Sequence, residues 1–221
     1  AGLNEPMSLD LDHAAEKMYW TELMGGVKRA DLNGSNVETL VPFTGGVTGF
    51  GMALDTFNHK MYWSLSNLNK IQRANLDGSN VEDVVATPGG PFGIAIDSNS
   101  NKIYWTEGDT LTIRRSNLDG SNVENLFTGL DKPTGIALDL SDQKMYWTSS
   151  TKDTGTIQRA SLSGLSVETL VSTGLDDLGD IALDVTNGKM YWAQPDLGKV
   201  QRANLNGSNV EDLVVRAPGT F

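Results

Sequence analysis

The stretch Lys102-Ile103-Tyr104-Trp105-Thr106-Glu107 decides the fold, because the chain carries four further versions of it. Each version places a Lys three residues before a Trp and a Tyr directly before that Trp. The tryptophans lie at positions 20, 63, 105, 147 and 192, so they are 43, 42, 42 and 45 residues apart. A period of this length is typical of repeat proteins, in which one supersecondary unit cannot bury its apolar face alone and stacks on its neighbours.

Each unit contains four short segments that suit β-strands. In the third unit, the first segment ends at Asp97, the second carries Tyr104-Trp105, the third contains Arg115 and the fourth begins at Glu124. A Gly five residues after the Arg, here Gly120, follows Asp or Asn in four of the five units. Asp-Gly and Asn-Gly pairs between apolar runs indicate hairpin turns, since Gly adopts positive φ without steric cost. The pattern therefore predicts four consecutive antiparallel strands in each unit.

Such a unit, repeated radially, is a β-propeller blade. We predict an all-β fold, a five-bladed β-propeller with four antiparallel strands per blade, as a single domain over residues 1–221. The first strand is expected innermost and the fourth outermost, where its Glu blunts an exposed sheet edge. A linear β-solenoid is the less favoured alternative. The predicted units are about residues 1–44, 45–87, 88–129, 130–173 and 174–221.

Composition excludes several classes of function. The 221 residues contain no cysteine, so neither disulfides nor thiolate metal sites are possible. The net charge of -11 argues against nucleic acid and anionic lipid as partners, because both require positive charge on the protein. No apolar run of about 18 residues is present, so insertion into a membrane is not expected. A basic or neutral protein or peptide fits better, and no cofactor or metal is expected.

The repeats resemble the YWTD repeats, also called class B repeats, of the low-density lipoprotein receptor. The resemblance rests on Tyr-Trp-Thr at 19–21, 104–106 and 146–148, on the Asp that ends each first segment, and on Ile-Gln-Arg-Ala followed by Leu-Asp-Gly-Ser at 71–79. It covers essentially the whole chain. It implies a β-propeller that binds or presents proteins without catalysis, in an extracellular or cell-surface, receptor-like setting.

The chain departs from that family in two respects. Family domains have six blades, whereas this chain carries five units. The Asp of the signature is replaced in every unit, so an ion pair from that position to the strand-three Arg is not expected in three units and is altered in the other two.

Residues 2–6 align with residues 129–133 and the last unit ends after its fourth segment, so we expect whole units and ordered ends up to Phe221. A complete five-bladed ring closed by packing is favoured, and a six-bladed ring lacking one unit is the alternative.

Loop lengths vary on one face of the predicted disc only. The distance from Trp to the strand-three Arg is 9, 10, 10, 12 and 10 residues, and the links between units also differ in length. The turns on the other face have constant length. Variable loops on a rigid scaffold are typical of a binding surface, although loops also drift without a function.

Candidate ligand-binding residues lie at the inner rim of the variable face. Met7, Phe50, Phe92 and Thr134 precede the first strands and form an apolar floor, although either Phe could simply plug the channel. An acidic flank is formed by Asp176, Asp177 and Asp180. Weaker candidates at the ends of the second strands are Glu22, Glu107 and Gln194.

The sequence therefore predicts a non-catalytic protein- or peptide-binding propeller. No catalytic residues are assigned, because Ser-His, Cys-His and paired-His signatures do not recur and both His13 and His59 belong to the constant turns. One alternative is a propeller hydrolase or lactonase with an oxygen-ligated metal in the channel, held by Asp10 and Asp180; Asp10 is otherwise expected to be solvated or paired locally. A multivalent carbohydrate-binding propeller is the other.

Overall fold

The structure is a computed structural model that describes residues 5–151 and 154–215. In these ranges it contains twenty β-strands and one short 3₁₀ turn, η1 (Ser66–Leu68). The strands form five sheets of four consecutive antiparallel strands. Within this part of the chain, no helix has the length and apolar character needed to cross a membrane.

The sheets follow the order of the repeats. Sheet 1 contains β1 (Pro6–Asp12), β2 (Lys17–Glu22), β3 (Gly26–Asp31) and β4 (Glu38–Val41). Sheet 2 contains β5 (Gly49–Asp55), β6 (Lys60–Leu65), β7 (Lys70–Asn75) and β8 (Glu82–Ala86). Sheet 3 contains β9 (Pro91–Asp97), β10 (Lys102–Glu107), β11 (Thr112–Asn117) and β12 (Glu124–Thr128). Sheet 4 contains β13 (Pro133–Asp139), β14 (Lys144–Thr151), β15 (Thr154–Ser161) and β16 (Glu168–Val171). Sheet 5 contains β17 (Ile181–Asp184), β18 (Lys189–Gln194), β19 (Lys199–Asn204) and β20 (Glu211–Val215).

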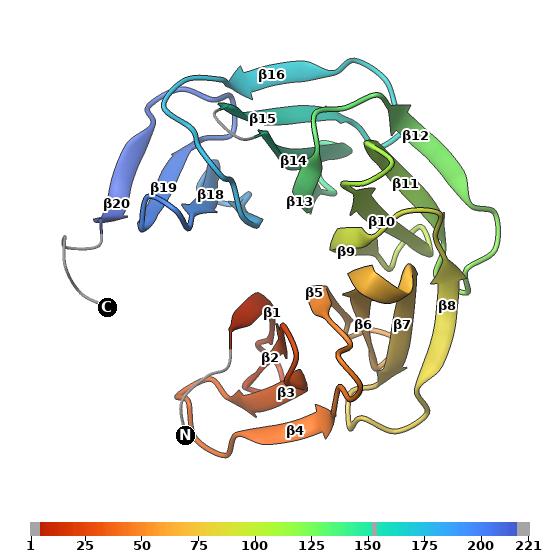
Figure 1. The fold of residues 1–221 in the computed structure, drawn as a ribbon. Coiled ribbons are helices and arrows are strands. Elements are labelled where there is room, and N and C mark those ends of the chain that lie inside the picture. Colours follow the sequence, from red (N-terminus) through yellow and green to blue (C-terminus); the bar gives the residue numbers. More distant parts are fainter. Residues whose placement is uncertain (1–4, 152–153, 216–221) are drawn as a thin grey trace.

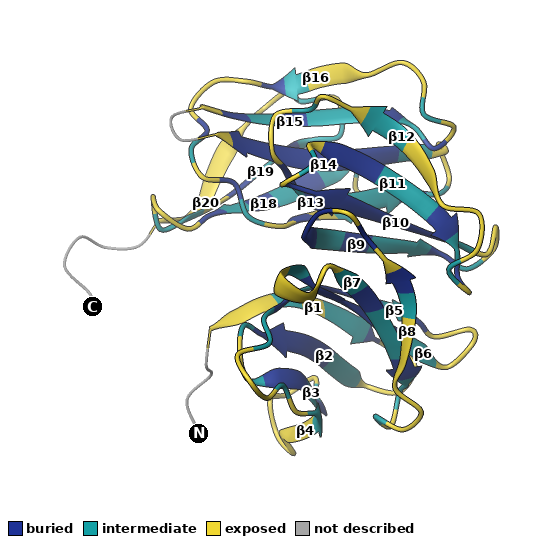
Figure 2. Ribbon diagram, turned by 45° about the vertical axis from the view of Figure 1, so that its right-hand side comes forward, coloured by how far each residue is buried: buried dark blue, intermediate teal, exposed yellow. Residues whose placement is uncertain are grey.

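The five sheets lie around a central axis, with the first strand of each sheet innermost and the fourth outermost (Figure 1). The predicted all-β fold, a five-bladed β-propeller with four antiparallel strands per blade, is confirmed. Middle strands such as β10 and β14 are mostly buried and outer strands such as β20 are exposed (Figure 2). The outer edge is closed by ion pairs of 2.6–3.0 Å between the strand-three Arg and the first Glu of the fourth strand.

Neighbouring sheets are held together by one recurring apolar interface. Alternation along a strand sends successive side chains to opposite faces of the sheet. In sheet 3, Tyr104 and Ile113 therefore pack against sheet 4, where they meet Met145 and Trp147, and Trp105 packs back against sheet 2. We call the face of a sheet that is directed toward the following sheet its leading face, and this face carries Tyr and a branched residue. The opposite face, directed toward the preceding sheet, is the trailing face and carries Trp and usually Met. The four junctions between consecutive sheets each form a buried cluster of this kind.

The junction between sheet 5 and sheet 1 differs from the other four. Leu9 on the trailing face of sheet 1 is 53% exposed, whereas the residues at the same register in sheets 2 to 5 are 4–5% exposed. Val200 on the leading face of sheet 5 is 37% exposed, whereas its counterparts in sheets 1 to 4 are 0% exposed. Among the described residues, the inner edges of these two sheets approach through a hydrogen bond of 2.9 Å from Ser8 Oγ to Asp180 Oδ2.

The expected ring closed by packing is therefore wrong for this structure. Sheets 1 and 5 stand apart at their outer strands (Figure 1), and their facing apolar surfaces remain open to solvent. The predicted alignment of residues 2–4 and the ordered end at Phe221 lie outside the described residues.

Val27 and Val200 occupy the same register in a closed and an open junction, so substituting each one tests whether the two junctions differ in packing. Val27 is 0% exposed in the junction between sheets 1 and 2. We expect Val27→Ala to lower the free energy of unfolding by about 2 to 3 kcal/mol through lost burial and a residual cavity. Val200→Ala should cost less than about 1 kcal/mol, since solvent already reaches that side chain. Urea unfolding of both variants measures the difference; equal losses would show that Val200 is packed in solution.

Candidate functional site

Hydrogen bonds between turns identify the two faces of the propeller. On one face, a backbone N–H just after the third strand donates to a carbonyl in the turn between the first two strands, at 2.9–3.2 Å in all five sheets; the donors are Leu32, Leu76, Leu118, Leu162 and Leu205. On the other face, the loops between the second and third strands also bond to the links between sheets, but no single bond recurs in all five units. Leu130 N donates to Leu111 O, for example, whereas Thr48 N donates to Asn67 Oδ1. We call the second face the variable-loop face, and it is the face predicted to vary.

The inner rim of the variable-loop face is fixed by hydrogen bonds between blades. A hydroxyl on the second strand of one sheet donates to a rim carbonyl of the next sheet. The acceptors are the carbonyls of Phe50, Phe92, Thr134 and Gly179, which receive bonds from Thr21, Ser64, Thr106 and Thr148, respectively. These residues occupy the same place in successive units, so the predicted rim positions are brought together at one edge of the channel.

Two rim side chains form an aromatic pair. The rings of Phe50 and Phe92 lie edge to face, with centroids 4.8 Å apart and an interplanar angle of 67°. Both residues are half-buried. Gly108 in the neighbouring loop leaves room for Phe92, because a Cβ at Gly108 would lie 2.8 Å from that ring. The loop at Gly108 therefore packs against the Phe92 ring, and both rings keep part of their surface exposed for contact with a ligand.

The other two members of the predicted apolar floor, Met7 and Thr134, differ from the Phe pair in their exposure and contacts. Met7 is 39% exposed, at the edge of the opening between sheets 1 and 5. Thr134 is half-buried and its Oγ1 donates to Leu178 O at 3.1 Å. The accessible apolar surface at the rim thus comes from Phe50, Phe92 and Met7.

Carboxylates line the rim beside the opening. Asp180 accepts hydrogen bonds from Ser8 Oγ and, at 2.9 Å, from its neighbour Ile181 N. Water reaches Asp180, but the surrounding protein removes part of its solvation, which raises its pKa, and the charge of Asp10 raises it further. Asp10 accepts hydrogen bonds from Leu11 N of its own strand and from Leu54 N of sheet 2, at 2.8 Å each. Burial raises the pKa of Asp10 and these bonds oppose the rise.

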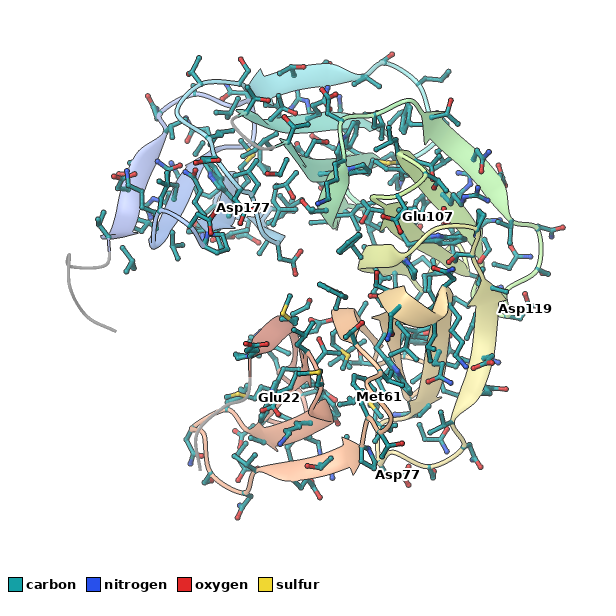
Figure 3. The ribbon with its side chains drawn as sticks, viewed as in Figure 1. Glu22, Met61, Asp77, Glu107, Asp119 and Asp177 are labelled. Carbon is teal, nitrogen blue, oxygen red and sulfur yellow. The ribbon has the colours of Figure 1, made fainter. Side chains whose placement is uncertain are left out.

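Asp176 and Asp177 lie in the link before β17, and Figure 3 labels Asp177 there. Asp177 is exposed and Asp176 is half-buried, with its backbone N–H donating to Gln194 Oε1 at 2.8 Å. The sequence-predicted acidic flank therefore surrounds the start of sheet 5, on the same face as the aromatic pair.

The three weaker candidates, Glu22, Glu107 and Gln194, are at most 2% exposed. Glu107 Oε1 accepts from Trp105 Nε1 at 2.9 Å and lies 3.1 Å from Arg114 Nε, at ion-pair distance. Glu22 is paired with Lys28 at 3.1 Å. In sheet 5 the corresponding Gln194 donates to Gln201 Oε1 at 2.5 Å. Figure 3 labels Glu22 and Glu107, whose side chains lie within their blades.

The sequence did not reveal the partners of these buried groups. The sequence predicted only that an ion pair to the strand-three Arg would be altered in this unit, and Arg115 in fact pairs with Glu124 at the outer edge. The residue before it, Arg114, lies opposite Trp105 in the register and reaches Glu107. Alternation along the strand is the signal that could have identified it, because adjacent residues point to opposite faces of a sheet.

The described residues contain no group of three or more His, Cys, Asp or Glu side chains placed to share a metal ion. His13 and His59 both lie in turns between the first and second strands, on the face opposite the rim. The geometry of the rim therefore offers an apolar and acidic contact surface.

Removing a buried partner should cost far more than removing an exposed one. Glu107→Ala removes the counter-charge of Arg114 and the acceptor of the Trp105 N–H, so we expect a loss of about 3 to 5 kcal/mol in the free energy of unfolding. Glu124→Ala breaks the exposed pair with Arg115 and should cost at most about 1 kcal/mol. Denaturant unfolding tests both, and similar losses would contradict the buried assignment of Glu107.

Asp180→Asn tests the raised pKa of Asp180. A carboxyl whose pKa is raised on folding contributes stability below its unfolded pKa, and this is lost as the pH rises through the folded pKa. The Asn variant should therefore have a higher Tm than the parent at pH 7, and the gap should shrink as the pH falls towards 4. A Tm difference that does not change with pH would contradict the raised pKa.

Comparison with known proteins agrees with the fold. Residues 101–140 match the model of the low-density lipoprotein receptor repeat class B. The structure is similar to a chain in the crystal structure of a nidogen/laminin complex, with a TM-score of 0.79 and 21% identity, covering 86% of this chain and 75% of that chain. It is also similar to virginiamycin B lyase from Staphylococcus aureus, with a TM-score of 0.74 and 17% identity over 98% of this chain and 72% of that one. Hydrazine synthase of Kuenenia stuttgartiensis gives a TM-score of 0.72 at 11% identity, over 96% and 67% of the two chains.

The three structural matches have low sequence identity and establish the shared fold alone. The family match identifies the repeat itself, at the stretch from which the fold was predicted. Residues 101–140 are thus a class B repeat of the low-density lipoprotein receptor type, set in a β-propeller, and the resemblance predicted from the sequence is confirmed.

Proposed function

We propose that this propeller is a non-catalytic scaffold that binds a protein or peptide on its variable-loop face, around the mouth of the channel. The extracellular or cell-surface setting implied by the family resemblance belongs to the same proposal. The observation that carries it is the half-buried pair of Phe50 and Phe92, held 4.8 Å apart at the inner rim.

The rim has the composition of a small binding site. Aromatic side chains supply much of the binding energy at protein interfaces, especially where the surrounding structure already holds them in place. The bonds from Thr21 and Ser64 to the rim carbonyls fix the backbone of both Phe residues before any ligand arrives. A ligand side chain that covers the two rings therefore meets a preorganised surface.

The carboxylates favour a particular ligand chemistry. Asp176, Asp177 and Asp180 border the same rim, and the chain as a whole carries a net charge of -11. A peptide with Lys, Arg or an amide next to an apolar residue would be complementary to this surface, and its association would be steered by the field of the protein. An acidic peptide would be repelled.

The comparisons support this reading over the alternatives. The nidogen/laminin complex is a protein–protein complex, and the matching family model is that of a receptor repeat. The virginiamycin B lyase has 17% identity to this chain and shares the fold only. We therefore propose binding without catalysis.

A peptide library displayed on phage, selected against the immobilised protein, tests the proposal. We expect peptides that combine a basic residue with an apolar one, and an affinity loss of about thirtyfold in Phe50→Ala, Phe92→Ala, as for a hot spot worth about 2 kcal/mol. Binding to Asp176→Asn, Asp177→Asn should weaken and lose much of its salt dependence.

Phe57→Ala is the matched control. Phe57 is an 82% exposed Phe in the turn between β5 and β6, on the opposite face. Its removal should leave the affinity unchanged, and Phe50→Leu, Phe92→Leu keeps the buried volume if the Ala variant loses stability. Peptides that bind all the rim variants as well as the parent, or that need Phe57, would contradict the proposed site.

A further inference from the structure

The hairpin turns between the third and fourth strands share one geometry. In all five sheets, the turn glycine donates its backbone N–H to the carbonyl of the residue three positions earlier, at 2.8–3.0 Å. In four of these turns, a side-chain oxygen just before the glycine accepts hydrogen bonds from the backbone N–H and the Oγ of the serine just after it. The accepting residues are Asn33, Asp77, Asp119 and Asn206.

A carboxylate is sufficient for this turn. Asp77 Oδ1 accepts from Ser79 N at 2.9 Å and from Ser79 Oγ at 2.5 Å. Asn33 Oδ1 accepts the same two bonds from Ser35, at 2.9 and 2.7 Å. Because the turn uses only a side-chain oxygen, it does not require the amide group of Asn. What Asn adds in the turns of sheets 1 and 5 is its Nδ2 nitrogen.

Both asparagines begin the tripeptide Asn-Gly-Ser, which is an acceptor pattern for N-linked carbohydrate. No other Asn in the chain is followed two positions later by Ser or Thr. Asn33 and Asn206 are both exposed. Their Oδ1 atoms are held by the serines, whereas neither Nδ2 atom donates a hydrogen bond to any described residue. The nitrogen that carries the sugar in such a linkage is therefore the free end of an oriented amide.

A third Asn-Gly pair, at Asn187, lacks this arrangement. Asn187 is also exposed and lies in the turn between β17 and β18. Lys189 stands two positions later, so no hydroxyl is available there. The Nδ2 atom of Asn187 donates to Asp184 Oδ2 at 2.7 Å. A free amide nitrogen with a serine on its oxygen thus distinguishes Asn33 and Asn206 from this pair.

The position of the two turns leaves room for carbohydrate. They join the two outer strands of their sheets, on the face opposite the variable-loop face. A Cβ built on Gly34 meets no atom within 4 Å, so the turn of sheet 1 stands in open space. Gly207 lies against Leu170, but the neighbouring Asn206 side chain is exposed. A glycan at either site therefore extends away from the rim.

We propose that Asn33 and Asn206 are acceptor sites for N-linked oligosaccharide, added by a membrane-bound transferase from a lipid-pyrophosphate donor. Nδ2 bonds to the anomeric carbon of the first sugar as the bond from that carbon to the pyrophosphate oxygen breaks. The amide nitrogen gives one proton to a base of the transferase, and the lipid pyrophosphate leaves with the bonding electron pair. The inference rests on the extracellular or cell-surface setting in the proposed function, and it does not depend on the rim contacts.

Secretion of the full chain from cultured animal cells, behind a cleavable secretion signal, tests this inference. A glycan-releasing amidase in heavy-oxygen water leaves a labelled Asp at each occupied position, which peptide mass spectrometry locates. A parallel incubation without the amidase corrects for spontaneous deamidation of Asn-Gly. We expect enzyme-dependent label at positions 33 and 206 and none at 187. Asn33→Asp and Asn206→Asp should each remove one glycan, and the double variant should carry none.

The repeat supplies matched controls. Asp77→Asn creates a third Asn-Gly-Ser in the same turn geometry and should gain a glycan. Ser35→Ala and Ser208→Ala keep the asparagines but remove the hydroxyl, so each should lose the glycan of its turn. The Asp variants reproduce the turns of sheets 2 and 3, so we expect them to keep the circular dichroism spectrum of the parent.

A secreted parent without carbohydrate at 33 and 206 would overturn the inference, most sharply if Asp77→Asn gains a glycan in the same cells. Carbohydrate that persists in the double Asp variant would overturn the assignment of the sites. Binding of the phage-selected peptides is measured on the same samples, which separates this result from the proposed function. Peptide binding without carbohydrate refutes this inference alone, and carbohydrate without peptide binding refutes the rim site alone.

Discussion

The structure depends on the packing of the leading face of one sheet on the trailing face of the next. A single four-stranded sheet has two apolar faces and cannot bury either one alone, so stability is shared between neighbours. The Tyr-Trp pair is the centre of this arrangement, because adjacent residues on one strand point to opposite faces. Tyr104 therefore serves the junction with sheet 4, and Trp105 the junction with sheet 2.

The same junctions position the candidate binding surface. Hydroxyls of the second strands donate to rim carbonyls one sheet further on, so the rim is ordered by the bonds that join the blades. Phe50 and Phe92 occupy equivalent places in consecutive units, and this equivalence brings their rings together. The buried Glu107 pairs with the half-buried Arg114 and accepts a hydrogen bond from Thr110 in the loop between β10 and β11. The candidate surface at the rim and the stability of the blades thus share one set of contacts.

The pairing of charged residues at the outer edge also follows the repeat. The outer-edge Glu residues are paired with the strand-three Arg residues, and the Arg73 guanidinium holds the pKa of Glu82 below its usual range. These pairs account for part of the acidity and leave the rim carboxylates as the acidic groups that face the channel mouth. Their surroundings raise the pKa of both Asp10 and Asp180, and Asp180 also accepts the hydrogen bond from Ser8 that joins the first and last sheets.

The sequence by itself determined the strands, their order and the face on which each side chain lies. The period of the Tyr-Trp pair, the turn glycines and the Arg and Glu at fixed spacing were sufficient for this, because alternation along a strand is a local property. The pairing of Glu107 with Arg114 lies within sheet 3 and follows from the alternation. Tertiary structure alone decided one other matter: it left Leu9 and Val200 exposed where a closed ring was expected. This depends on how the sheets are inclined to one another around the axis, and the inclination is a sum over all junctions that no single repeat encodes.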